Sequence, residues 1–303
     1  MSNEHIEWPK KTRELHSNHF DSTVWNDFNF RDDDVIIATY AKSGTTWTQQ
    51  IVSQLIFEGE EGLNVSELSP WVDLRVPAKE DKLAMIDAQT HRRFVKTHLP
   101  VDALVFSPTA KYIYIVRDGR DTLWSMYNHH SSANDEWYAL LNETPGLVGE
   151  PMPPCDKPVL EYFRHWLENN GEPFWPFWDN INSWWSIRHL PNVKLVHFAN
   201  LKKNMPYEIG KIAEFLEIQI DNSKWNAILE HCSFEYMKEH AELVAPLGGI
   251  VFEGGAKAFL HKGTNGRWKD VLMQEDVERY EEVAKEQLGE QCAHWVATGH
   301  GLD

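Results

Sequence analysis

The sequence predicts one α/β domain in which a doubly wound parallel sheet carries helices on both faces. Four short segments are apolar without the strict alternation of half-exposed strands, as expected of strands that are covered on both sides. Helical stretches separate these segments, which favours βαβ connections. With 303 residues, of which 42% are hydrophobic and 25% charged, the chain can bury a sizeable core. We therefore expect a single domain over residues 1–303, of which about the first 30 form an N-terminal extension.

Each predicted element has a local signal. The strands are short and rich in β-branched or aromatic residues: 35–40 (VIIATY), 93–97 (RFVKT), 111–116 (KYIYIV) and 193–198 (VKLVHF). The helices are expected at 45–57 directly after the first strand, 121–130 after the third, 178–189 before the fourth, and 274–289, which is rich in Glu and Lys. Ligands of such sheets bind at the carboxyl ends of the strands, so functional residues should directly follow strands.

Two segments are candidate lids. Residues 142–158 contain five Pro and two Gly and read as a long surface loop, which is either an insertion or a lid. Residues 245–266 contain six glycines and form the second candidate.

Charge and cysteine content exclude several classes of protein. The formal charge of −17 argues against coating nucleic acid or an anionic membrane, so an anionic ligand needs a local basic pocket. Three cysteines without a CxxC pair make a disulfide framework or a structural zinc site improbable, and we expect no metal. The charged N-terminus and short apolar runs predict a cytoplasmic protein without a membrane span.

The segment TYAKSGTTW, residues 39–47, predicts a phosphate cradle between a strand and a helix. Gly44 permits a tight turn, and the first amides of the helix point toward an anion. An ammonium and three hydroxyls surround that turn, on Lys42, Ser43, Thr45 and Thr46. The lysine precedes the only glycine, so this is not the Walker A order of nucleotide-binding enzymes.

A second and a fourth segment add cations. RDGRDTLWS, residues 117–125, follows the third strand and places Arg117 and Ser125 where they can meet a second anionic group, although a surface ion pair would also explain Arg117. HKGTNGRWKD, residues 261–270, offers Lys262 and the unhindered amide of Gly263, or is a plain surface turn. Two separate anion sites indicate a ligand with two phosphate-like groups.

The third segment, KTHLP, follows the second strand and offers a base. His98 has the side chain whose ordinary pKa lies nearest neutrality, so at a ligand-binding strand end it is a candidate general base. Lys96 lies two residues earlier and should face the same way, where it can stabilise charge on a leaving group.

Together, these four motifs in this order resemble the cytosolic sulfotransferase family, and we expect a bacterial member with a P-loop-like fold. The resemblance runs from about residue 25 to the C-terminus. It implies transfer of the sulfuryl group of 3′-phosphoadenosine 5′-phosphosulfate (PAPS) to a small acceptor, with adenosine 3′,5′-bisphosphate (PAP) as the product. It also implies that His98 is the general base and that Lys42 and Lys96 stabilise the transferring group, with no metal required.

The resemblance further assigns the donor site. It implies that the 5′-phosphosulfate is bound by Lys42, Ser43, Gly44, Thr45 and Thr46. The adenine would be contacted by Trp47, Phe198, Cys232, Ser233, Phe234 and Met237. The 3′-phosphate would be bound by Arg117, Ser125, His261, Lys262 and Gly263.

This chain departs from the family at five positions. His261 stands where an Arg is common, and Phe198 replaces a Tyr. Arg267 replaces an Asp, and Met273 and Gln274 alter the dimerisation motif, which leaves a monomer and a homodimer open.

Two other functions stay open at this point. A non-catalytic PAP-binding module would keep the cradle without turnover, and a nucleotide-dependent kinase is disfavoured by the missing Walker A order. Aromatic residues in 20–30, 124–137 and 245–266 either line a slot for a neutral phenol or alcohol or belong to the core, and His129 and His130 either contact that acceptor or end a helix.

Overall fold

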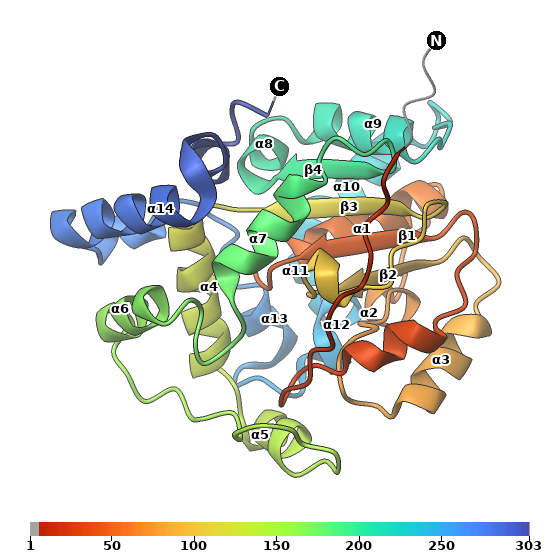
Figure 1. Cartoon of the computed structure of the whole chain (residues 1–303). Helices are drawn as coiled ribbons and strands as arrows, with labels where there is room; N and C mark the ends of the chain where they lie inside the picture. The colour runs from red at the N-terminus through yellow and green to blue at the C-terminus, as the bar shows by residue number, and fades with distance from the viewer. Residues whose placement is uncertain (1–5, 303) are drawn as a thin grey trace.

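The computed structural model describes residues 6–302, and its centre is a parallel sheet of four strands. In spatial order the strands are β2 (Phe94–Thr97), β1 (Val35–Thr39), β3 (Lys111–Val116) and β4 (Val193–His197). In the register, Val35 of β1 pairs with Phe94 on one side and with Lys111 on the other. The predicted doubly wound sheet is confirmed, with all four strands within one residue of the expected bounds (Figure 1).

Helices surround the sheet (Figure 1). The α-helices are α1 (Thr45–Ile56), α2 (Val65–Leu68), α3 (Lys79–Asp87), α4 (Gly119–Ser131), α5 (Asp135–Asn142), α6 (Val159–Glu168), α7 (Phe177–Ser186), α8 (Phe198–Lys203), α9 (Met205–Phe215), α10 (Trp225–His231), α11 (Phe234–Glu239), α12 (Ala241–Val244), α13 (Gly255–Phe259) and α14 (Gln274–Thr298). The 3-10 helices are η1 (Ser22–Asp27), η2 (Val101–Ala103), η3 (Pro246–Gly249) and η4 (Arg267–Asp270). No helix within residues 6–302 is both long and apolar enough to cross a bilayer.

Three predicted boundaries are wrong for local reasons. The helix expected over 178–189 is α7, which ends at Ser186, because the amide of Ile187 bonds back to the carbonyl oxygen of Trp184. Phe198 was expected to end the fourth strand but begins α8, because the side chain of His197 accepts a hydrogen bond from the amide of Ala199 and starts the helix there. The last helix was expected to end at Gly289. That residue does leave helical geometry, with φ 73° and ψ 163°, but the helix continues because residues beyond it are buried, including Trp295.

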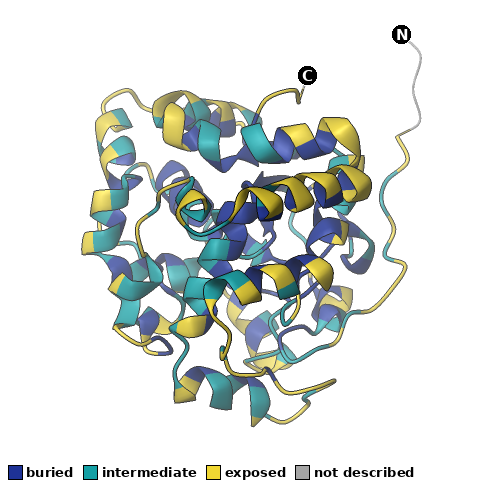
Figure 2. Ribbon diagram, turned by 90° about the vertical axis from the view of Figure 1, so that its left-hand side faces the viewer, coloured by how far each residue is buried: buried dark blue, intermediate teal, exposed yellow. Residues whose placement is uncertain are grey.

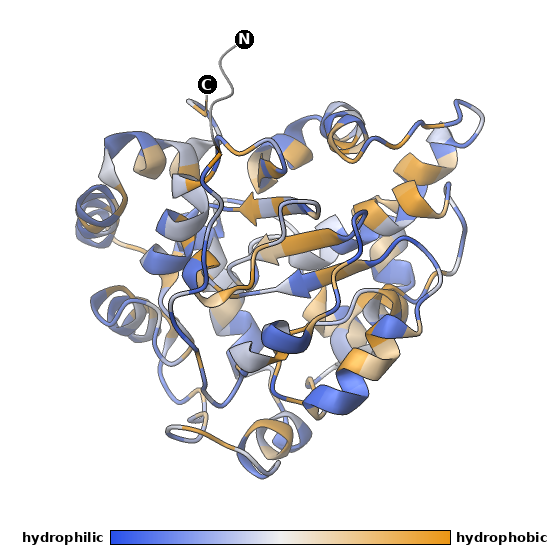
Figure 3. Ribbon diagram, turned by 45° about the vertical axis from the view of Figure 1, so that its right-hand side comes forward, coloured by the Kyte–Doolittle hydropathy of each residue, from blue (hydrophilic) through white to orange (hydrophobic). Residues whose placement is uncertain are grey.

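Each face of the sheet packs against its own layer of helices. Ile36 and Ala38 of β1 join a large core with side chains of α4, α7 and α14. Val35 and Ile37, which point the other way, join a second core with α1, α9 and α10. Burial on both faces explains why the strands are apolar without alternation. Buried residues gather at the centre of the molecule in Figure 2, and the two central strands are mostly hydrophobic in Figure 3.

Both candidate lids pack on α5, which lies apart from the sheet at the bottom of Figure 1. Trp137 and Leu141 of α5 form a third apolar cluster with Met152 from residues 142–158 and with Val251 and Phe252 from residues 245–266. The first segment has no helix or strand between α5 and α6, as predicted, whereas the second contains η3 and α13.

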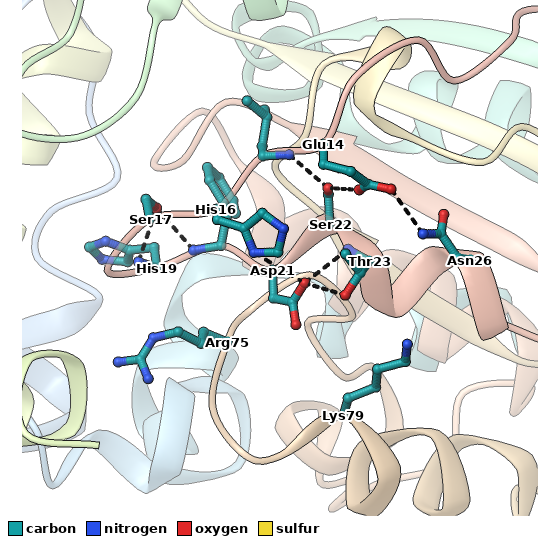
Figure 4. A network of polar contacts seen from close by, with 12 residues as sticks. Glu14, His16, Ser17, His19, Asp21, Ser22, Thr23, Asn26, Arg75 and Lys79 are labelled. Carbon is teal, nitrogen blue, oxygen red and sulfur yellow. Dashed lines mark hydrogen bonds and ion pairs between the residues drawn. The ribbon is translucent and has the colours of Figure 1, made fainter. Parts of the chain in front are cut away.

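The N-terminal segment is fastened to the domain by a polar network. Ser22 bonds to the carboxylate of Glu14, which also accepts from Asn26 at 2.9 Å (Figure 4). Trp25 is fully buried in the large core. The part of the predicted extension within residues 6–30 is thus integrated into the fold, and residues 1–5 lie outside the described chain.

Candidate active site

The predicted site residues meet at one edge of the sheet. Because β1, β2 and β3 are parallel neighbours, their carboxyl ends lie side by side. The chain leaves β1 toward Gly44, leaves β2 at His98 and leaves β3 at Arg117. Motifs that are far apart in the sequence therefore share one edge.

The turn between β1 and α1 forms a backbone cradle. Gly44 has a φ of 121°, and a Cβ atom there would lie 2.8 Å from Ile115 Cδ1 and 2.9 Å from Phe198 Cδ2, so only glycine fits. Among the described residues no side chain caps α1, which leaves its first amides directed at the turn. The hydroxyl oxygens of Thr45 and Thr39 lie 2.7 Å apart beneath it. This arrangement suits an anion.

Two further hydroxyls and an ammonium complete the cradle. Ser43 is buried, with its Oγ 3.4 Å from the Oγ1 of Thr122 on α4, and Thr46 is half-buried on α1. The Nζ of Lys42 lies 3.8 Å from the centre of the Phe259 ring. Burial lowers the pKa of Lys42 to about 7, and the charges of nearby Lys96 and Arg117 add to the effect. An anion in the cradle would restore that charge.

The imidazole of His98 is held in one tautomer. Its Nδ1 lies 2.8 Å from the carbonyl oxygen of Thr39, which can only accept, so Nδ1 carries the proton and Nε2 is left with a lone pair. Burial lowers the pKa of His98 to about 3, and the charge of Lys96 contributes next. His98 is therefore neutral at physiological pH and able to accept a proton at Nε2.

The backbone of His98 is fixed from two sides. Its amide donates to Oδ2 of Asp73 at 3.2 Å, and Nδ2 of Asn180 donates to its carbonyl oxygen at 2.9 Å. Asp73 is itself buried and also accepts from the indole nitrogens of Trp25, at 3.2 Å, and Trp71, at 2.7 Å. These bonds fix the position of the ring.

Lys96 lies beside His98, as predicted. Burial lowers its pKa to about 8, although Asp73 partly opposes that shift. Its Nζ lies 5.5 Å from the centre of the Trp71 ring, and its charge lowers the pKa of His98. Lys42, Lys96 and His98 thus share one electrostatic environment.

Arg117 faces the turn at residues 264–266. Its Nε donates to Oδ1 of Asn265 at 3.0 Å, and its Nη2 donates to the carbonyl oxygen of Thr264 at 2.8 Å. The guanidinium also lies 4.5 Å from the centre of the Phe198 ring. Ser125 lies on α4, eight residues after Arg117, and is half-buried. The chain therefore brings the second and fourth motifs together.

The residues predicted to contact the adenine form two groups: aromatic rings that pack against each other, called the aromatic wall, and buried side chains behind them. Trp47 packs edge-on against Phe198, with ring centres 5.3 Å apart, and its indole donates to the carbonyl oxygen of Cys232 at 2.8 Å. The side chains of Cys232 and Met237 are buried in the core behind α1, so they support the wall. Ser233 begins α11, where it caps the amide of Tyr236 at 3.1 Å.

The fourth motif completes this side of the site. Gly263 lies against Phe234, because a Cβ atom there would come within 2.9 Å of the ring. His261 and Lys262 are exposed on the turn.

Several neighbours of the site were not predicted. Thr39, Asp73 and Asn180 position His98, and their motifs carry no local signal for that role. Trp71 and Trp175 lie 4.6 and 5.6 Å from the imidazole of His98, ring centre to ring centre. These residues meet only through the packing of distant segments.

The comparisons with known proteins agree with this geometry. The family model described as "Sulfotransferase domain" matches residues 32–291. The chain belongs to this family. A glycolipid sulfotransferase of Mycobacterium bovis is 30% identical over 282 residues, which cover 86% of each chain. Sulfotransferase 1 family member D1 of Mus musculus is 30% identical over 263 residues, covering 84% of this chain and 83% of the relative.

Solved structures show the sulfotransferase fold. A mouse sulfotransferase complexed with PAP covers 90% of this chain and 91% of its own, at a TM-score of 0.68 and 22% identity. Retinol dehydratase in a complex with retinol and PAP covers 88% of this chain and 84% of its own, at a TM-score of 0.69 and 24% identity. The predicted family, fold and enzyme class are confirmed. Relatives from bacteria and mammals match at similar identity, so the bacterial origin stays a prediction.

Proposed function

We propose that this sulfotransferase moves the sulfuryl group of PAPS to a hydroxyl of a small, neutral, hydrophobic acceptor, with His98 as the general base. One observation carries the proposal. The carbonyl oxygen of Thr39 holds the proton on Nδ1 of His98, so the basic Nε2 belongs to a neutral ring beside Lys42 and Lys96.

His98 takes the proton of the acceptor hydroxyl as its oxygen attacks sulfur. In the free protein the pKa of His98 is about 3, because of burial first and the charge of Lys96 next. A bound anion offsets the charge of Lys96 and raises that pKa, so the base strengthens when the donor is in place. The Nδ1 bond to Thr39 then stabilises the imidazolium.

Lys42 and Lys96 stabilise the charge that moves onto the leaving phosphate. Both ammonium groups are desolvated, with pKa values lowered to about 7 and about 8, so an adjacent anion is strongly favoured to recharge them. Two lysines supply here the kind of charge that kinases obtain from Mg²⁺. That no metal is required stays a prediction.

The residues present fit the donor. The uncapped start of α1 and the glycine-only turn at Gly44 suit the 5′-phosphosulfate. Arg117, Ser125, Lys262 and Gly263 lie toward the second anion site, and Trp47, Phe198 and Phe234 form an aromatic wall for the adenine. Sulfotransferase and retinol dehydratase structures of this fold are complexes with PAP, which supports the proposal.

The proposed acceptor side is rich in aromatic rings. The ring of His19 lies 5.5 Å from Trp175 and 5.6 Å from Phe174, centre to centre, next to the Trp71 and Trp175 rings that flank His98. Burial lowers the pKa of His19 to about 3, so this ring is neutral. Such a wall favours a neutral, apolar acceptor. Relatives whose names mention glycolipid, retinol or androsterone support this class.

The sequence left the aromatic residues and two histidines ambiguous. Phe20, Trp25 and Phe28 all lie in the large core, and the ring of Phe20 is also tilted against Trp175, with ring centres 4.6 Å apart. His129 lies among Trp137 and the lid residues Phe252 and Phe259, and we assign it to the acceptor side. His130 donates from Nε2 to the carbonyl oxygen of Pro153 and so holds the first candidate lid. A contact between His130 and the acceptor stays a prediction.

The test is a mass-spectrometric screen of the purified protein with PAPS against phenols, steroids and aliphatic alcohols. Sulfated product from at least one neutral acceptor is expected, and none from their carboxylated analogues. PAP binding without product from any acceptor would instead identify a non-catalytic PAP-binding module, and binding of ATP·Mg²⁺ without PAP binding would identify a kinase.

Location and assembly are also proposed. All three cysteines are unpaired, which supports a reducing, cytoplasmic setting. A homodimer, and the absence of nucleic-acid or membrane partners inferred from the charge of −17, stay predictions.

A further inference from the structure

The turn at residues 264–268 is attached to one face of α4. The amide of Gly266 donates to both carboxylate oxygens of Asp121, at 2.8 and 3.0 Å. Arg120 directly precedes Asp121, and its guanidinium carbon lies 4.0 Å from the centre of the Trp268 ring. The position of the residue between these two contacts, Arg267, is therefore fixed by the fold.

Arg267 extends over the same face of α4. Its guanidinium carbon lies 5.1 Å from the centre of the Trp124 ring, and Trp124 directly precedes Ser125. Arg117 lies two residues before α4 begins, and Asp121 lies four residues after Arg117 and four before Ser125, so these three positions share one side of the helix. Arg267 thus lies on the side that carries Arg117 and Ser125.

Arg117 has one counter-ion on this face, because its Nη2 lies 4.0 Å from Oδ1 of Asp121. The pKa of Arg117 is lowered, chiefly by burial. The charges of Asp121 and Asp118 oppose this shift, and the charge of Arg267 adds to it, so the two guanidinium groups repel each other. Within residues 6–302 no carboxylate forms an ion pair with Arg267, whereas the neighbouring Arg120 has Asp118 and Glu281. The indole Nε1 of Trp124 is buried and has no acceptor in that same part of the chain. An anion placed here would relieve the repulsion.

His261 does not supply the missing charge. Burial lowers its pKa, and the charges of Arg267, Lys262 and Lys238 lower it further. Its Nδ1 lies 2.7 Å from Nη1 of Arg267, and because a guanidinium can only donate, His261 is the acceptor and is neutral there. Of the pair His261 and Arg267, it is therefore Arg267 that carries the positive charge.

We propose that Arg267 is a further binding residue for the 3′-phosphate of the donor, and that it replaces the arginine that position 261 lacks. The inference rests on the proposed PAPS site. A guanidinium carries several N–H donors in a planar fork, which suits a phosphate beside Arg117 and Ser125.

The test compares two ligands that differ only in the 3′-phosphate. Dissociation constants of PAP and of adenosine 5′-monophosphate are measured by titration calorimetry for the full-length wild type and for Arg267→Gln. We expect Arg267→Gln to weaken PAP binding about tenfold, since one charge-assisted hydrogen bond is lost, and to change 5′-monophosphate binding less than about twofold. The readout is the ratio of the two dissociation constants for one protein. Partial unfolding of a variant affects both constants equally and therefore leaves this ratio unchanged.

Lys269→Gln is the matched control. It removes the same charge from the same turn at an exposed position and should leave the ratio of the two constants within about twofold. Arg267→Lys should recover part of the PAP affinity. An equal loss for both ligands, or equal effects of Arg267→Gln and Lys269→Gln, would overturn the assignment of Arg267. A wild type that does not prefer PAP over the 5′-monophosphate would instead overturn the proposed donor site itself.

Discussion

Nδ1 of His98 lies 2.8 Å from the carbonyl oxygen of Thr39, the last residue of β1. The bond joins the end of one strand to the residue that follows its neighbour β2, and it comes from the backbone, so no substitution at position 39 removes the acceptor. It determines which ring nitrogen of His98 can serve as a base.

His98→Ala should lose turnover but keep PAP binding. Removing a general base costs roughly 10²- to 10⁴-fold in kcat, while the donor contacts that we propose at Gly44 and Arg117 are untouched. Steady-state sulfation and calorimetric PAP titration measure the two effects. His294→Ala, at an exposed histidine on α14, is the control and should behave as wild type. A kcat for His98→Ala within about twofold of wild type would contradict the assignment.

PAP affinity should fall as pH rises from about 7 to 9. The pKa of Lys42 in the free protein is lowered to about 7, so below that pH the ammonium is already charged, and above it a proton must be taken up on binding. The pKa of Lys96 is lowered to about 8, so the pH range in which binding takes up a proton extends further upward. Calorimetry in two buffers of different ionisation enthalpy measures the uptake.

Lys42→Met should weaken PAP binding roughly 10- to 100-fold near neutral pH and flatten this slope. Lys257→Met, which removes an exposed lysine of α13, should keep both the affinity and the slope. A PAP affinity of wild type that does not change between pH 7 and 9 would show that the ammonium of Lys42 is not desolvated in solution.

Gly44→Ala should destabilise the protein and abolish PAP binding. The new Cβ would lie 2.8 Å from Ile115 Cδ1 and 2.9 Å from Phe198 Cδ2 at a φ of 121°, which costs roughly 1–3 kcal/mol of unfolding free energy. Gly62→Ala separates the two causes, since Gly62 has a φ of 74° but no atom within 4 Å of the place that an alanine methyl would take. Thermal melts should show a much larger loss for Gly44→Ala, and equal losses would mean that backbone strain alone is responsible.

Asp73→Ala should lower both stability and kcat. Its buried carboxylate accepts from Trp25, Trp71 and the amide of His98, so its removal leaves three donors unsatisfied and costs roughly 3 kcal/mol or more. Asp32→Ala, at an exposed position, is the control and should change the unfolding midpoint little. If Asp73→Ala were destabilised yet kept wild-type kcat at low temperature, the network would support the core without positioning the base.

Local sequence signals predicted the fold and the candidate site residues at one edge of the sheet. The strands were recognisable because burial on both faces requires apolar residues at every position, as in Ile36 and Ile37. Gly44 was recognisable because a tight strand-to-helix turn needs positive φ. The predicted helix end at Gly289 was wrong, although a glycine with positive φ often ends a helix. Helix α14 continues past Gly289, and residues beyond it, such as Trp295, are buried.

By itself the sequence determined the parallel sheet, the cradle around Gly44 and the candidate base at His98, because each depends on residues adjacent in the chain. Only the tertiary structure decided the tautomer of His98, the packing of Trp71 and Trp175 around its ring, and the position of Arg267 beside Trp124 of α4. Each of these depends on contacts between segments tens to more than a hundred residues apart, where distance and burial set charge and hydrogen bonding.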